Sequence, residues 1–251
     1  MRATHLEFRL RFFIHLVLIT LGFWAPWIGV IAPPHGFASH VTLLEWLAGT
    51  ASRTGLVTFT FAAPFFVCVG IGCAALAAAL RVWGAAYLGP VTVQHGEMQA
   101  GAVMAAGPYR YLRNPLYLGL WFMVAAISLS MPPSGALFAL VCIPLFVMRL
   151  ILGEEAFLSA QLGEPYRVYC LAVPRLIPRL RAVLPRVAAR PQWLRAVITE
   201  IAPIGILVTL ALFSWSYDHI FLMRGILISL GVSLVARALV PSGQPHFNQA
   251  D

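Results

Sequence analysis

Six long apolar runs, separated by turns and polar segments, make up most of the chain. They cover residues 12–32, 56–80, 116–131, 136–152, 196–215 and 220–239. A helix needs about 20 predominantly apolar residues to cross a bilayer, and the runs cluster around this length. The pattern predicts an all-α polytopic membrane protein with about six transmembrane helices.

Turn residues mark the ends of these runs. Gly89 and Pro90 follow the second run, which we expect to continue as a helix through Tyr87. Residues 132–135 join the third and fourth runs into a hairpin, and residues 216–219 join the last two. The basic start and first run also fit a secretory signal peptide, but the run exceeds the usual apolar region of about 7–15 residues.

The composition agrees with a membrane protein and excludes several other classes. Hydrophobic residues make up 60% of the chain, charged residues only 10%, and the mean hydropathy is +0.84. Soluble domains have about 45–50% apolar and about 25% charged residues. So few charged residues could not form a water-soluble surface, and the composition therefore excludes a cytosolic enzyme, a disordered protein and a disulfide scaffold. Cysteines and histidines lack metal-ligand spacing, so no metal site is predicted.

The net charge is +8, and every basic residue is arginine. In a membrane protein such an excess sets topology and contact with anionic lipid, so the expected partner is the bilayer rather than nucleic acid. With six spans, only Arg53 and Arg224 fall on one side of the membrane. Arginine-rich loops stay cytoplasmic. We therefore expect both termini and the segments 81–114 and 149–195 to face the cytoplasm, in a bacterial inner membrane.

A first candidate for chemistry is residues 107–119, with the sequence GPYRYLRNPLYLG. Asn114 is a good N-cap and Pro115 a good first helical residue, so a span should begin there. Its free backbone N–H groups would attract an anion at the interface, helped by Arg110 and Arg113. The alternative is an ordinary membrane helix flanked by interfacial tyrosines and arginines.

A second candidate lies at the end of the fourth run, which should continue into a helix closed by Gly163. Glu154 and Glu155 are two acids directly after a span, where charge is costly and therefore a sign of function. Beyond them, Tyr166 and Tyr169 share a face if their stretch is helical. The alternative is a solvated acidic pair that neutralises nearby arginines.

Together and in this order, the two segments resemble the isoprenylcysteine carboxyl methyltransferase family and its phospholipid methyltransferase relatives. The first has the form GPYxxxRxPxYxG, and the second an acidic pair, a glycine, Tyr-x-x-Tyr and Val173-Pro174. The similarity covers roughly residues 76–180, a predicted methyltransferase core. Residues 1–75 would then be N-terminal membrane helices, and residues 181–251 a basic linker with a C-terminal hairpin.

The resemblance implies a membrane enzyme that uses S-adenosylmethionine, held in a cytoplasmic-face pocket and not in a Rossmann domain. It implies a lipidic or prenylated acceptor. Arg113 suits the cofactor carboxylate by its charge. The cofactor contacts carried over by position are Tyr111, Asn114, Pro115, Tyr117, Leu118, Glu154 and Glu155.

The acceptor chemistry decides which side chains matter. A carboxylate needs no deprotonation, only a cation to hold it, and Arg149 or Arg175 is placed for this role. An amine needs a base, for which Glu155 is the candidate. The resemblance favours carboxyl O-methylation of an isoprenylcysteine-like group, with phospholipid N-methylation as the alternative. Relatives with prenyl-protein substrates usually carry histidine where Asn114 stands, and asparagine cannot titrate.

Two other classes stay open at this point. A membrane reductase of the sterol-reductase kind has a similar layout but needs a nicotinamide cofactor. A transporter or scaffold is the non-enzymatic alternative. Transporters place broken helices near the midplane, often in paired repeats. Here the ionisable residues gather at one interface and no repeat is present.

Overall fold

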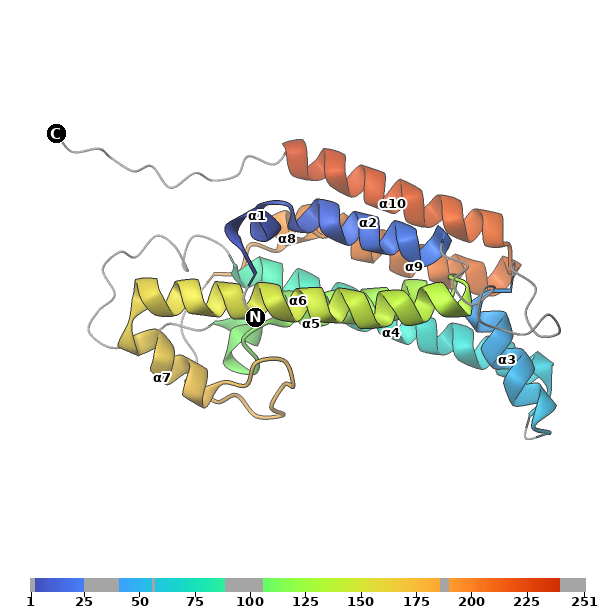
Figure 1. Ribbon diagram of the computed structural model, residues 1–251, viewed down its shortest axis with the longest axis horizontal. Helices are drawn as coiled ribbons and strands as arrows, with labels where there is room; N and C mark the ends of the chain where they lie inside the picture. The colour runs from blue at the N-terminus through green and yellow to red at the C-terminus, as the bar shows by residue number, and fades with distance from the viewer. Residues whose placement is uncertain (1–2, 25–40, 56, 89–105, 186–189, 240–251) are drawn as a thin grey trace.

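The structure, a computed structural model, describes residues 3–24, 41–55, 57–88, 106–185 and 190–239. All regular elements in these ranges are helices, which confirms the predicted all-α class. Figure 1 shows an elongated bundle of nearly parallel helices. The elements are α1 (His5–Arg9), α2 (Arg11–Trp24), α3 (Leu43–Arg53), α4 (Phe59–Tyr87), η3 (Gly107–Arg110), α5 (Pro115–Ser128), α6 (Pro133–Leu162), α7 (Glu164–Ala172), α8 (Trp193–Thr199), α9 (Ile201–Ser216) and α10 (His219–Leu239).

Each of the six apolar runs contains a helix of this bundle. Helices α2, α5 and α9 run in one direction and α4, α6 and α10 in the other (Figure 1). Within the described ranges, three helices are long and apolar enough to cross a membrane: α4, α6 and α10. The pair α8 and α9, bent by 68°, makes a fourth if it is one span. The protein is therefore an integral membrane protein with three or four candidate spans.

Two apolar helices are shorter than a bilayer requires. Helices α2 and α5 have 14 residues each, which corresponds to about 21 Å against a hydrocarbon core of about 30 Å. The expected continuation of the first run through residues 25–32 lies outside the described residues. Six spans therefore remain a prediction.

Helix α4 packs against α3, α5, α8 and α9 and so holds the bundle together. Small buried residues, among them Ala74 and Ala77, let its neighbours approach closely. On the outside of the bundle, large apolar side chains such as Phe61, Leu145 and Trp215 are exposed. This surface fits lipid tails and not water.

Helix α6 extends past the end of the neighbouring helices (Figure 1). Its 30 residues span about 45 Å, and Glu154 and Glu155 lie about two turns before its end at Leu162. Gly163 ends the helix with φ +64°, a conformation that favours glycine. The chain then reverses into α7. At this end of the bundle lie η3, α7, the end of α4 and the start of α8. We call it the arginine-rich end.

Helix α3 was not among the predicted elements. Its start carries a capping box, in which Glu45 N donates to Thr42 Oγ1 at 3.3 Å and Thr42 N donates to the Glu45 carboxylate at 2.9 Å. The Thr-x-x-Glu spacing is a sequence signal for a helix start and would have located α3.

Candidate active site

The two motifs meet at the arginine-rich end through backbone hydrogen bonds. The residues before α5 run alongside the segment that follows α7. Arg113 N donates to Pro174 O at 2.9 Å, Arg179 N to Tyr111 O at 3.2 Å, and Val183 N to Arg110 O at 3.0 Å. These bonds join residues that are 60 or more positions apart in the sequence and fix the two segments in one place.

The Glu155 carboxylate lies between two arginines. Arg113 Nη1 is 2.8 Å from Glu155 Oε1. On the other side, the Arg175 guanidinium donates from Nη2 at 2.8 Å and from Nε at 3.1 Å. The side chains of Glu155 and Arg113 are 12% and 11% exposed, whereas that of Arg175 is 39% exposed. Glu155 is thus an almost buried acid whose charge both motifs neutralise.

This cluster carries one more positive than negative charge. The hydrogen bonds to Glu155 raise the pKa of Arg175, which keeps its guanidinium charged. Arg113 Nε is buried and has no hydrogen-bond partner within the described residues. An unsatisfied buried donor costs free energy, so an added acceptor would be stabilised there. The excess charge and the free donor both favour an anionic group.

The start of α5 lies directly after Arg113. As predicted, Asn114 is the N-cap and Pro115 the first helical residue, but the Asn114 side chain does not cap the helix. Its amide instead donates to Arg175 O at 3.1 Å and ties the two motifs together again. The N–H groups of Leu116 and Tyr117 have no acceptor inside the helix, which leaves them available to a ligand.

The two neighbouring acids point to different partners. Glu154 accepts a hydrogen bond from the Tyr117 hydroxyl at 3.1 Å, within the space between α5 and α6. Glu155, one position later, turns to Arg113 and Arg175. Glu154 therefore binds α5 and Glu155 binds the arginines, so the two acids do not form one shared acidic site.

Tyr166 and Tyr169 lie on one face of α7, as the spacing predicted. Both are buried and their ring centroids are 5.8 Å apart. The Tyr169 hydroxyl donates to Tyr109 O at 2.9 Å. Burial raises the pKa of both hydroxyls above the ordinary value for tyrosine, so they stay protonated. These residues hold α7 against η3.

An open cleft of about 540 Å³ lies beside the Glu155 cluster. Its volume falls within the range of ligand sites, about 300–1,000 Å³. Three small residues of α6 line it and take up little of its space: Ala156, Ser159 and Ala160. The other lining residues are Arg113, Leu152, Glu155, Arg167, Cys170, Leu171 and Arg175.

Three of the sequence-predicted site residues, Arg113, Glu155 and Arg175, line this cleft. The others do not line it: Tyr111, Asn114, Pro115, Tyr117, Leu118, Glu154 and Arg149. Tyr111 lies against Trp83, with ring centroids 5.9 Å apart. Arg149 binds Glu7 through Nη2, at 2.8 and 2.9 Å from its two oxygens. The structure therefore gives Arg149 a carboxylate partner from α1.

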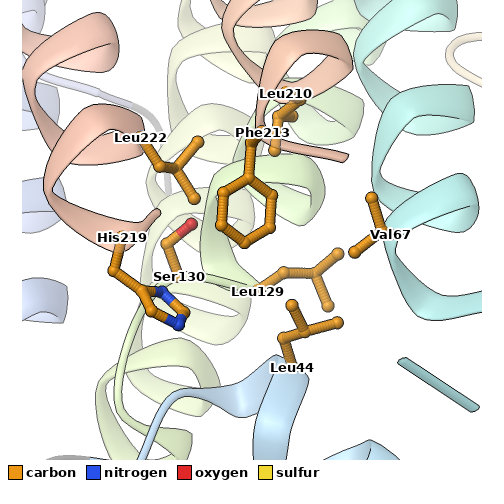
Figure 2. Close-up of a pocket in the computed structure, with 8 residues that line it drawn as sticks. All are labelled: Leu44, Val67, Leu129, Ser130, Leu210, Phe213, His219 and Leu222. Carbon is orange, nitrogen blue, oxygen red and sulfur yellow. The ribbon is translucent and has the colours of Figure 1, made fainter. Parts of the chain in front are cut away.

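A second cavity (Figure 2) lies beside α3, which Figure 1 shows at the opposite end of the bundle from α7. The side chains of His219, Ser130 and Phe213 point into it, surrounded by Val67 and leucines. Its volume, about 10 Å³, suffices for one water molecule at most. It is too small for a cofactor.

Sequence reasoning missed the ion pair between Arg81 and Glu200, whose side chains are 13% and 6% exposed. A single acid, Glu200, inside the apolar run 196–215 was the available signal, because a charge at such a place needs a partner. Within the described part of the chain, no group of three or more histidine, cysteine or acidic side chains is arranged to hold a metal ion.

Residues 65–164 match the family model described as phospholipid methyltransferase. This segment covers most of α4 and all of α5 and α6, and it contains the first motif and the acidic pair. No curated protein matches the chain, and no solved structure matches it.

Proposed function

We propose that the protein, a membrane methyltransferase that uses S-adenosylmethionine, transfers the methyl group to a carboxylate on a lipidic or prenylated acceptor. The observation that carries the proposal is the Glu155 cluster: one nearly buried carboxylate between two arginines, on the wall of a cleft. The reductase and transporter alternatives do not agree with a phospholipid methyltransferase domain.

The residues at the arginine-rich end fit the cofactor. Its carboxylate would bind at Arg113, where Nε lacks a partner, and at the free N–H groups of the first turn of α5. Its ammonium would bind at Glu154 or Glu155. The further contacts that we propose are Tyr111, Asn114, Pro115, Tyr117 and Leu118.

The bound cofactor supplies an electrophilic methyl group on a sulfonium, which is already an activated leaving group. The protein then has to place the acceptor oxygen and keep water away. Arg175 is the residue that we propose holds the acceptor carboxylate, because it lines the cleft, is partly exposed and keeps its charge. Arg149 is a weaker candidate, since Glu7 already neutralises it.

The pairing of Glu155 favours a carboxylate over an amine. An amine acceptor must lose a proton, and Glu155 was the candidate base. Glu155 is already paired with the guanidiniums of Arg113 and Arg175, which compete with an amine for its oxygens. A carboxylate acceptor needs no base. Phospholipid N-methylation stays the alternative, favoured by the description of the matching family.

The excess of positive charge at this end supports a cytoplasmic orientation. We propose that the active site faces the cytoplasm of a bacterial inner membrane. We also propose that residues 76–180 form the methyltransferase core, between the N-terminal helices and the C-terminal hairpin. The family match over residues 65–164 supports the position of the proposed core.

Methyl transfer to matched acceptors tests the proposal. The full chain in lipid nanodiscs is incubated with S-adenosylmethionine labelled in its methyl group. The acceptors are a prenyl thioether with a free carboxylate, the same compound as a carboxamide, and phosphatidylethanolamine. We expect label on the carboxylate compound alone, released as methanol by mild base. Label only on phosphatidylethanolamine, stable to base, would establish N-methylation instead.

A further inference from the structure

The C-terminal hairpin is joined to the methyltransferase domain by a buried ion pair. Arg81 Nε, on α4, donates to Glu200 Oε2 at 2.6 Å. Both side chains are almost fully buried, at 13% and 6% exposure. The pair crosses 119 positions of sequence and links a residue inside the family match to one outside it.

Arg81 also binds the start of α5. Its Nη1 donates to the carbonyl oxygen of Leu116 at 3.1 Å. Gly119, one turn later, leaves room for the aliphatic part of Arg81, because a Cβ at this glycine would collide with it. One guanidinium therefore bridges Glu200 and the first turn of α5.

Glu200 lies at the break between α8 and α9, where the helix axis bends by 68°. Helix α8 is docked on the end of α4 by two further contacts. Gln192 N donates to Ala86 O at 2.9 Å, and the rings of Tyr87 and Trp193 are 6.3 Å apart. The break thus holds the Glu200 carboxylate at a fixed place beside α4.

We infer that Glu200 is a positioning residue for methyl transfer, which acts through Arg81 on the first turn of α5. Without the carboxylate, the Arg81 guanidinium would lose the partner that aims it at Leu116. The turn that it holds carries Asn114 and Tyr117, so the inference rests on the proposed cofactor role of this turn. Hydrophobic residues of similar volume are often at least as stable as a buried ion pair, so this pair need not be present for stability alone.

The inference is tested with the full chain in nanodiscs, by titration with S-adenosylmethionine and by thermal melting without it. The variants are Glu200→Gln, Arg81→Gln, their double variant and Arg81→Lys. Arg113→Gln reports on the proposed cofactor site itself. Lysine at position 81 can keep the ion pair with Glu200. Its single ammonium cannot also reach Leu116 O, to which a second nitrogen of the Arg81 guanidinium donates.

We expect Glu200→Gln and Arg81→Gln each to weaken cofactor binding by about tenfold, the effect of one lost buried hydrogen bond. The double variant should bind no more weakly than Arg81→Gln, since both changes act on one contact. Arg81→Lys should melt as the parent does yet bind about tenfold more weakly. This split between stability and affinity is what a purely structural ion pair would not produce.

Any of four results would overturn the inference. Parent-like binding by Glu200→Gln together with weak binding by Arg113→Gln would reject it and leave the cofactor site standing. Parent-like binding by both variants would reject the proposed site as well. Independent, multiplying effects in the double variant would show that Glu200 does not act through Arg81. If Glu200→Gln does not fold, parent-like affinity of Arg81→Lys decides against the inference.

Discussion

Arg113 and Glu155 form an ion pair at 2.8 Å that joins the residue before the N-cap position of α5 to the last third of α6. The first belongs to the GPYxxxRxPxYxG segment and the second to the acidic pair, so the contact unites the two motifs. Both side chains are nearly buried, and the removal of the Glu155 charge would leave the Arg113 guanidinium without its ionic partner. The pair therefore fixes the start of α5 against α6.

Ligand specificity separates a methyltransferase from a nicotinamide enzyme. S-adenosylmethionine or its demethylated product should raise the melting temperature of the purified protein, and NADPH should not. At 100 times its dissociation constant, a ligand of the folded state adds about 2.7 kcal/mol to the free energy of unfolding. Melting curves of a monodisperse sample measure the shift. The absence of a shift with millimolar S-adenosylmethionine would contradict the proposed cofactor site.

Arg175 should matter for the acceptor. Arg175→Gln removes the cation that we propose holds the acceptor carboxylate, and kcat/KM for the carboxylate compound should fall by about ten- to hundredfold. Steady-state kinetics with varied acceptor measure it. Arg179→Gln is the matched control, because Arg179 is exposed and does not line the cleft. Equal losses in both variants would indicate a general effect of surface charge.

The orientation of the bundle is testable at its two ends. Glu164, at the start of α7, and Thr54, after α3, are both exposed and lie at opposite ends of the molecule (Figure 1). In a variant without native cysteines, Glu164→Cys should react with an impermeant thiol reagent only from the cytoplasmic side. Thr54→Cys should react only from the other side. Reversed labelling in sealed inner-membrane vesicles would overturn the proposed topology.

Local features of the fold followed from the sequence. The Asn114-Pro115 pair located the start of α5, and Gly163 the end of α6. The spacing of Tyr166 and Tyr169 predicted their common face. These features depend on a few neighbouring residues and on helical periodicity, which the chain displays directly.

The partners within the site did not follow from the sequence. Glu155 was expected as a cofactor contact, but its ion pairs with Arg113 and Arg175 were not predicted. The position of Arg175 depends on the non-helical path after Val173, which distant backbone hydrogen bonds hold. Arg81–Glu200 and Arg149–Glu7 likewise join distant segments. Helical periodicity carries no signal for contacts of this range.

We propose that S-adenosylmethionine binds at Arg113, the first turn of α5 and Glu155, and titration of Glu155→Gln with this cofactor tests this proposal most directly. Glutamine keeps the shape of the side chain, removes the charge that we propose binds the ammonium, and takes away the ionic partner of Arg113. Charge-assisted hydrogen bonds contribute about 1.5–3 kcal/mol, so affinity should fall by about ten- to hundredfold. Glu164→Gln, whose side chain is 73% exposed, is the matched control and should bind as the parent does. Parent-like affinity in a folded Glu155→Gln variant would contradict the claim.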